Sequence, residues 1–297
     1  MYFLRPAAST DTDKAAIARI CQHTWDGEDD YIMDVWDEWI ADPSGCILLL
    51  EVDSQPIGMV RLTRLSNSEG WIEGLRVDRT HRQQGWGSVL IDAAMQQAAT
   101  LGLSTVRTCI HQHNAIMHGF IQRRGYGGLG DYGWYRANCV SQAPSVLQPL
   151  QLDDLEMAWA ALHRFQPRTE SCLFVCRGAK WQRHTQAALA QRLQQGWVWG
   201  EVRSRTLHSL FIRSSMDTPD GTFWVGWVGG TPEAMGMALQ DIRRLAHQLG
   251  FPYAGGFFPQ TQPAIDQLSA TDYTFQAPNM YRVYEIKVND PVGRSLH

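Results

Sequence analysis

Apolar residues in the first half of the chain alternate between helical and strand spacing. Residues 11–13 can cap a helix that carries Ala16, Ile17, Ile20 and Cys21 on one side. Later β-rich runs are separated by short polar turns, which predicts an antiparallel meander. The expected elements are a strand at 2–6, helices beginning at 11–13 and spanning 31–40, strands at 46–52, 57–65 and 71–77, a helix at 88–100, a strand at 105–110, a helix at 114–124 and a strand at 131–138.

The second half of the chain resembles a worn copy of the first. A strand at 146–150 precedes an acidic helix start, as at the beginning of the chain. A strand at 223–228 leads to a helix at 232–249. The sequence of residues 250–253 then parallels that of residues 102–105, with similar spacing to a following helix. This pattern predicts a tandem duplication.

The repeat stops and restarts at a linker of residues 141–144, so we predict domains at 1–140 and 145–297. Strands mixed with helices in both halves indicate an α/β (α+β) fold class. We expect each domain to have a central mixed, largely antiparallel sheet flanked by helices.

Composition narrows the function classes. The formal net charge of −4 offers no basic face for nucleic acid, and no apolar run has the length of a membrane span. The N-terminus opens without a signal-type hydrophobic stretch, so we expect a cytoplasmic protein. Six scattered cysteines without a CxxC pair indicate reduced thiols rather than disulfides or a zinc site.

The most specific segment runs from Leu75 to Ser88. A strand ends at Val77, and two glycines, Gly85 and Gly87, then introduce a long helix. Glycines let the main chain approach a ligand closely, and the N–H groups of a first helical turn suit a pyrophosphate. A plain strand-to-helix turn is the simpler interpretation of Gly-x-Gly alone. The segment is neither a Walker loop nor a dinucleotide fingerprint.

The surrounding residues make the segment more specific. Arg82-x-x-Gly85-x-Gly87 after Leu75-x-Val77 resembles the pyrophosphate loop of the GCN5-related N-acetyltransferase (GNAT) superfamily. One helix and one strand later, Asn114 opens a helix that closes at Gly125-Tyr126, which resembles the second cofactor motif of that superfamily. The element order of the first half also matches its plan, whereas the second half matches it weakly.

The resemblance implies acetyl-CoA as the cosubstrate and direct transfer of an acyl group to an amine. Main-chain groups of Leu75 and Val77, with Arg76 between them, would bind the pantetheine arm as it splays two strands apart. The pyrophosphate would be held by the loop, and Asn114 would bond the pantetheine or brace the thioester end. The loop residues are Arg82, Gln83, Gln84, Gly85, Trp86, Gly87 and Ser88.

Glu73 is the expected base. It lies in the strand before the loop, where an acidic residue often serves this purpose in the superfamily, and an ordinary surface Glu is the alternative. The general acid is unassigned, because Ile121 stands where related enzymes commonly carry a Tyr. Tyr126, Tyr132 and Tyr135 are nearby alternatives.

The acceptor is expected to be a primary amine on a small molecule or peptide. Acidic residues between Trp25 and Trp39, including Asp30, Asp34 and Glu38, would favour a cationic small molecule, although a solvated acidic face is the more usual explanation of such a charge run. His111, His113 and His118 cluster around Asn114 but lack the partners of a metal site, so we expect no metal.

The second half lacks the loop motif, because Gly229-Gly230-Thr231-Pro232 joins strand to helix directly. We expect this half to complete the acceptor pocket, brace the first domain or form a homodimer. Four tryptophans expected on its surface would serve any of these: Trp197, Trp199, Trp224 and Trp227. Two alternatives to an enzyme remain, a regulatory sensor that binds acyl-CoA without turnover and a structural scaffold.

Overall fold

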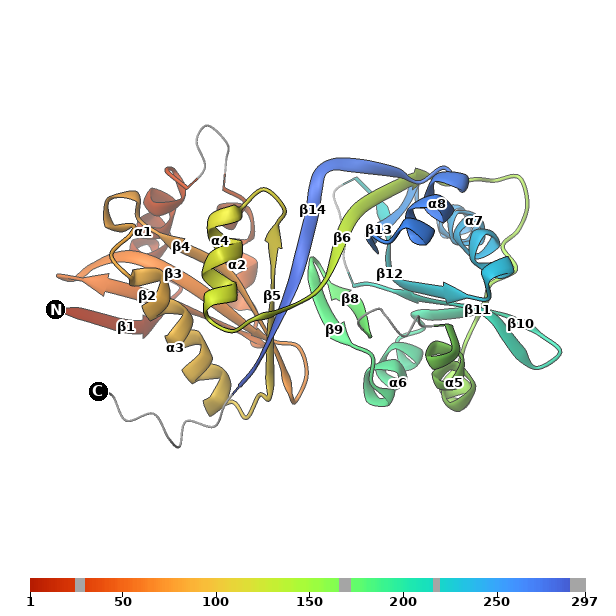
Figure 1. Ribbon diagram of the computed structural model, residues 1–297, viewed down its shortest axis with the longest axis horizontal. Coiled ribbons are helices and arrows are strands. Elements are labelled where there is room, and N and C mark those ends of the chain that lie inside the picture. The colour runs from red at the N-terminus through yellow and green to blue at the C-terminus, as the bar shows by residue number, and fades with distance from the viewer. Residues whose placement is uncertain (25–29, 166–171, 216–219, 289–297) are drawn as a thin grey trace. The chain divides into compact units, whose positions relative to one another are not determined.

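The computed structural model describes residues 1–24, 30–165, 172–215 and 220–288 (Figure 1). Its contacts define two compact units, which we call unit 1 (Met1–Thr108 with Glu285–His297) and unit 2 (Cys109–Tyr284). Each unit therefore contains a segment from the other half of the sequence. The domain boundaries inferred from the sequence repeat, 1–140 and 145–297, stay a prediction.

Unit 1 is built on a sheet with strand order β1-β2-β3-β4-β5. Adjacent strands are antiparallel except β4 and β5, which are parallel. Its elements are β1 (Tyr2–Pro6), α1 (Asp11–Cys21), α2 (Ile32–Ala41), β2 (Gly45–Val52), β3 (Gln55–Arg64), β4 (Glu69–Val77), the 3-10 turn η1 (Arg79–His81), α3 (Trp86–Thr100), the first residues of β5 (Thr105–His111) and the last residues of β14 (Thr274–Lys287).

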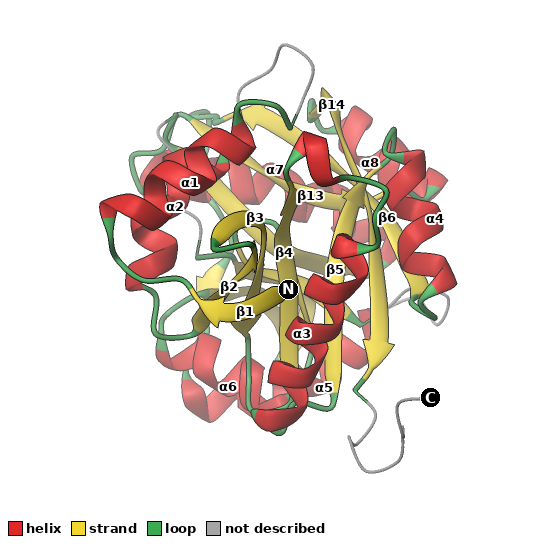
Figure 2. Ribbon diagram, turned by 90° about the vertical axis from the view of Figure 1, so that its left-hand side faces the viewer, coloured by secondary structure: helices red, strands yellow, loops and turns green. Residues whose placement is uncertain are grey.

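Helices cover both faces of this sheet (Figure 2). The buried stripe of α1 and α2, which includes Ile17 and Trp36, packs with Leu49 and Met59 on one face. On the other face, the side chain of Leu90 in α3 lies against Gly58, the neighbour of Met59. Successive strand residues point to opposite faces, so α1 and α2 lie on one side and α3 on the other. The buried residues of α3 lie along one side of the helix: Leu90, Ile91, Ala94 and Ala98.

Unit 2 holds a sheet with strand order β6-β13-β12-β11-β10-β7 and a separate hairpin, β8-β9. Its further elements are α4 (Ala115–Arg123), β6 (Gly127–Asn138), β7 (Gln148–Pro149), η2 (Leu152–Asp154), α5 (Leu155–Phe165), β8 (Leu173–Arg177), β9 (Lys180–Arg183), α6 (Gln186–Gln194), β10 (Val198–Arg203), β11 (Thr206–Arg213), β12 (Thr222–Gly230), α7 (Pro232–Gln248), β13 (Tyr253–Pro259) and α8 (Gln262–Ala270).

The two halves of the sequence have the same element order. With the β8-β9 hairpin set aside, the order from β7 to β14 repeats the order from β1 to β6, helix for helix and strand for strand. The parallel pair recurs at the corresponding place, between β12 and β13. The predicted α/β class, with helices flanking mixed sheets, is confirmed. Every element predicted for the first half is present, whereas the elements from β8 to β11 were not anticipated.

The prediction that four tryptophans lie on the surface of the second half is wrong for two of them. Trp224 is 4% exposed and Trp199 is 8% exposed. Trp199 packs against Phe211 and Phe223 in the core of unit 2. The parts of β10 and β12 that carry these rings are buried on both faces, and burying a large aromatic surface stabilises the fold.

Candidate active site

The site begins where β4 parts from β5. The two strands pair only at the start of β4, from Glu69↔Thr105 to Trp71↔Arg107, among the residues described. β4 itself continues to Val77. Its second half is therefore bonded on one side, to β3, and its other edge is open for a ligand to pair with.

A bulge lies in the same part of β4. Met59 faces Arg76 and Arg61 faces Glu73, so Val60 alone opposes Gly74 and Leu75. Gly74 has φ +66°, and a Cβ atom there would lie 2.8 Å from Cζ3 of Trp39. A bulge turns main-chain groups out of the ladder, so Gly74 and Leu75 can direct them toward a ligand.

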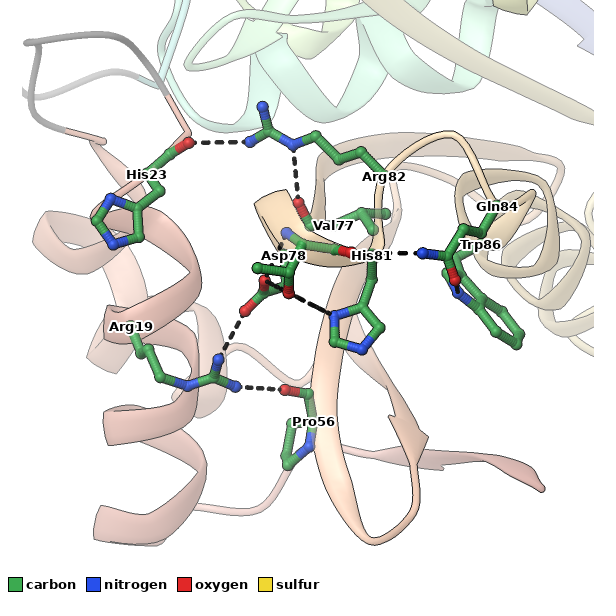
Figure 3. Close-up of polar contacts among 10 residues, drawn as sticks. Arg19, His23, Pro56, Val77, Asp78, His81, Arg82, Gln84 and Trp86 are labelled. Atoms are coloured by element: carbon green, nitrogen blue, oxygen red, sulfur yellow. Dashed lines mark hydrogen bonds and ion pairs between the residues drawn. The ribbon is translucent and has the colours of Figure 1, made fainter.

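After β4, Asp78 organises the turn into the loop (Figure 3). Its Oδ1 accepts from the N–H of Thr80 at 3.0 Å and from the Thr80 hydroxyl at 2.6 Å, and its Oδ2 lies 2.6 Å from Nη1 of Arg19. Burial raises the pKa of Asp78, but the bonds from Thr80 and the charge of Arg19 outweigh burial and lower it. Asp78 thus stays ionised and fixes the turn to α1.

Arg82 ties the loop to two other elements (Figure 3). Its Nε donates to the carbonyl of Val77 at 3.1 Å, and its Nη2 donates to the carbonyl of His23 at 3.0 Å. The side chain remains exposed. The predicted cation is therefore at the mouth of the loop, where it also braces the end of β4 against the segment after α1.

Gly85 gives the loop its final turn into α3. It has φ +87°, and no atom lies within 4 Å of the position of a Cβ atom. The helix begins at Trp86, and its first-turn N–H groups have no preceding carbonyls to bond. Residues 82–85 are exposed. This open, electropositive helix start fits a pyrophosphate.

The side chains beside Gly85 support the loop from outside. Gln83 takes φ +62°, and the Gln84 amide donates to the carbonyl of Thr80 at 3.4 Å. Trp86 donates from Nε1 to Oε1 of Gln84 at 3.3 Å, and its ring lies 5.6 Å from that of Tyr2. Gly87 and Ser88 lie in the first turn of α3.

Glu73, the expected base, lies in a buried charge cluster. Its Oε1 accepts from Nη1 of Arg61 at 2.6 Å and from the Thr63 hydroxyl at 3.0 Å. Arg61 is 1% exposed and also binds Asp42 at 2.6 Å, with its guanidinium 4.8 Å from the Trp39 ring. Sequence reasoning missed Arg61 and Asp42. The side chain of Glu73 is 13% exposed, so it is largely buried while Arg61 and Thr63 hold its carboxylate.

The side chain of Arg76 binds Asp30 rather than lying along the open edge of β4. Its Nε and Nη2 bind both carboxylate oxygens of Asp30, at 2.6 and 2.9 Å, and its Nη1 donates to the carbonyl of Leu75. The expectation that Asp30 belongs to an acidic rim is wrong, because its side chain is 1% exposed. Asp34 and Glu38 are exposed, and three further acidic positions, 26, 28 and 29, lie outside the described residues.

Asn114 belongs to unit 2, where it caps α4. Its Oδ1 accepts from the N–H of Met117 at 3.1 Å. Ile121, at the position where a Tyr is common, is 1% exposed and packs in the core. The alternative acids are also buried, with Tyr126, Tyr132 and Tyr135 at 4–6% exposure. None of these four side chains is exposed enough to identify it as the general acid.

The histidines near Asn114 make contacts within unit 2. His118 Nδ1 lies 2.8 Å from the hydroxyl of Tyr284, and His111 Nε2 lies 2.9 Å from the carbonyl of Pro278. Within the described ranges, no group of three His, Cys, Asp or Glu residues is arranged to hold a metal ion. Nor does any described helix combine the length and apolar character needed to cross a bilayer.

Comparison with known proteins agrees with this geometry. Residues 14–126 match the model of the Acetyltransferase (GNAT) family. A GCN5-related N-acetyltransferase from Sphaerobacter thermophilus has 14% identity and a TM-score of 0.59, over 97% of this chain and 96% of its own. A tandem GNAT protein from the clavulanic acid biosynthesis pathway has 11% identity and a TM-score of 0.55, over 97% and 99%.

A third similar structure is a putative acetyltransferase from Thermoplasma acidophilum, with 13% identity and a TM-score of 0.57, over 96% of this chain and 99% of its own. A search of curated protein sequences gives no significant match. The whole chain thus has the fold of tandem GNAT proteins, with the family match confined to the part that carries the loop.

Proposed function

We propose that the protein is an N-acetyltransferase that transfers an acyl group from acetyl-CoA to a primary amine. The observation that carries this proposal is the open edge of β4, bulged at Gly74 and followed directly by the Gly85 loop and the start of α3. Acetyl-CoA supplies an activated thioester whose carbonyl carbon an amine can attack. The GNAT match of residues 14–126 supports this reaction class.

Each part of unit 1 has a defined task in this proposal. Main-chain groups of Leu75 and Val77 bind the pantetheine arm along the open strand edge. The loop from Arg82 to Ser88 holds the pyrophosphate through its N–H groups and the Arg82 cation. Bulged main-chain N–H groups at Gly74 and Leu75 are suited to stabilise the oxyanion.

Glu73 is proposed to take the proton from the acceptor ammonium, directly or through one water molecule. The free amine nitrogen can then form the new C–N bond as the C–S bond breaks, and the thiolate leaves with its electron pair. Arg61 and Thr63 orient the carboxylate. The exposed carboxylates of Asp34, Asp37 and Glu38 support a cationic acceptor.

A non-catalytic acyl-CoA sensor is the second candidate. The contacts of Glu73 favour it, because Arg61 and Thr63 already bind the carboxylate oxygen that an acceptor amine would have to approach. The buried Ile121 at the usual Tyr position favours it as well. Turnover separates the two candidates.

The test follows thiol release from acetyl-CoA with a panel of polyamines, aminosugars and peptides. We expect one class of amine to raise the release rate, and Glu73→Gln to lower kcat by about 10²- to 10⁴-fold. CoA binding, followed by thermal shift, should be kept in Glu73→Gln. Binding without amine-dependent release would establish the sensor instead.

Two matched variants sharpen this test. Gly87→Glu places bulk and negative charge in the first turn of α3 and should abolish CoA binding. Ser66→Ala, on a turn away from the loop, is the control and should bind normally. A wild-type protein with no CoA binding at all would refute both candidates.

A further inference from the structure

The strands that correspond to β4 and β5 also part in unit 2. β12 and β13 pair in parallel from Thr222↔Tyr253 to Val225↔Gly256 within the described residues, although β12 continues to Gly230. β4 and β12 have nine residues each, and β5 and β13 have seven each. Both parallel pairings begin at the first residue of each strand.

This register aligns the two halves residue by residue. Glu69 corresponds to Thr222, and Trp71 therefore corresponds to Trp224. Further along, each strand bulges against the preceding strand: Arg61 faces Glu73 just before the bulge in β4, and Arg213 faces Val225 just before the bulge in β12. Glu73 thus corresponds to Val225 when counted from the bulge and to Gly226 when counted from the parallel pairing. Neither residue carries a carboxylate, so the second unit lacks the proposed base.

The space beside Gly226 is filled by the β8-β9 hairpin. A Cβ atom on Gly226 would lie 2.7 Å from the carbonyl oxygen of Val175 in β8. On the other strand, the ring of Trp181 in β9 lies 5.3 Å from that of Phe257, the first residue of β13 beyond the parallel pairing. The hairpin therefore contacts both strands where they separate.

The hairpin is held firmly in this place. The carbonyl of Cys176 accepts from the hydroxyl of Ser215 at 3.0 Å and from Nη2 of Arg192 at 3.1 Å. Leu173 to Cys176 are at most 3% exposed, and Trp181 is fully buried. An isolated two-stranded hairpin is marginally stable in water, so burial on both faces is what stabilises this one.

The hairpin arises from a longer connection. Residues 166–185 join α5 to α6, twice the length of residues 22–31, which join α1 to α2. Unit 2 also lacks the phosphate-binding loop. Only Thr231 separates β12 from α7, whereas residues 78–85 separate β4 from α3.

We propose that the β8-β9 hairpin permanently occupies the strand opening of unit 2, so that the chain binds one CoA, in unit 1, and unit 2 is catalytically silent. This inference rests on the proposed function for the identity of the ligand. The position of the hairpin does not depend on the proposed function, because the hairpin is a segment of this chain.

Calorimetric titration of the full chain with CoA tests the number of sites. We expect one CoA per wild-type chain and none for Gly87→Glu. Two CoA per chain, or residual binding by Gly87→Glu, would overturn the inference. If the wild type binds none, the proposed function fails, and the placement of the hairpin is decided by the variants described next.

Hydrogen exchange and one glycine variant test the hairpin independently of any folding defect in Gly87→Glu. CoA should protect peptides covering residues 75–90 and leave those covering residues 222–231 unchanged; protection of the latter would overturn the inference. Gly226→Ala should lower the melting temperature by about 4 °C, because its methyl group meets a main-chain oxygen. Gly119→Ala, facing only the flexible end of Arg123, is the control. Equal melting of both variants would contradict the hairpin placement.

Discussion

Buried charges at single residues connect the helices of unit 1 to its sheet. Arg76 in β4 binds Asp30, which also accepts from the N–H of Ile32, the first residue of α2, at 3.2 Å. Burial raises the pKa of Asp30, but the hydrogen bonds and charge of Arg76 outweigh burial, so the net pKa is lowered. Asp30 therefore holds α2 against β4 only while it is ionised.

Asp30→Asn should lower the free energy of unfolding at pH 7 by about 3 kcal/mol, because it leaves the buried Arg76 without its charge partner. A lowered pKa in the folded state means that the wild-type advantage is complete above the unfolded pKa of about 3.9. It should disappear as the pH falls through the folded pKa. Urea unfolding between pH 7 and pH 3 measures this difference.

Asp37→Asn is the control for this pH series. Asp37 pairs with Lys14, but their side chains are 80% and 41% exposed, so the change should cost less than about 1 kcal/mol. Equal losses in the two variants, or a difference that does not vary with pH, would contradict the role of Asp30.

Contacts between residues that are far apart in the sequence could not be predicted from the sequence. The place of Arg82 and Gly85 in a loop between a strand and a helix could be predicted, because it depends on spacing within one segment. The cluster of Asp42, Arg61 and Glu73 could not, since its members come from a turn and two strands that meet only in the folded sheet. Pairing of Asp30 with Arg76, 46 positions apart, was hidden for the same reason.

At the scale of elements, two left-handed glycines shape the ends of the proposed cosubstrate site. Gly74 forms the bulge in β4, and Gly85 turns the loop into α3. They differ in their surroundings, because a Cβ atom would meet Trp39 at Gly74 and nothing within 4 Å at Gly85. Packing therefore restrains the bulge at Gly74, whereas at Gly85 the constraint is the left-handed main-chain conformation.

Gly85→Ala should cost about 1 kcal/mol of unfolding free energy from backbone strain. Gly74→Ala adds overpacking against Trp39 and should cost about 2–4 kcal/mol in total. Urea unfolding of both variants makes the comparison, and each serves as the other's control. Equal costs would mean that Trp39 moves aside at no expense and that packing does not fix the bulge.

Periodicity predicted the elements of the first half because its helices are amphipathic and its turns are polar. It failed between residues 172 and 213, where β8 is buried on both faces and shows no alternation. The same burial concealed the surroundings of Trp199 and Trp224, since a ring in the sequence carries no sign of the face on which it lies.

At the scale of the molecule, unit 1 is completed by residues from the far end of the described chain. Arg107, which is fully buried, donates from Nη1 to Glu69 at 2.7 Å and from Nε to Glu285 at 2.8 Å. Lys287 and Val288 add hydrogen bonds to Thr105 and Ser104. The linear repeat gave no sign of this arrangement, because the residues involved are 178 positions apart.

Glu285→Ala should lower the free energy of unfolding by about 3 kcal/mol, because it removes one of two carboxylates from a fully buried guanidinium. Arg282→Ala on the same strand is the control; its pair with Asp131 is exposed and should contribute less than about 1 kcal/mol. Chemical unfolding followed by tryptophan fluorescence compares them. If both variants lose the same small amount, Glu285 does not hold unit 1 together.

The position of residues 285–288 also sets an order of events during synthesis. A ribosome releases them only after every residue of unit 2, although Met1–Thr108 of unit 1 emerge first. Until then Arg107 has Glu69 as its carboxylate partner and lacks Glu285. Domains generally fold as they emerge, from the N-terminus onward. Here unit 1 starts first, but a nascent chain can bury both carboxylate partners of Arg107 only after unit 2 has been made.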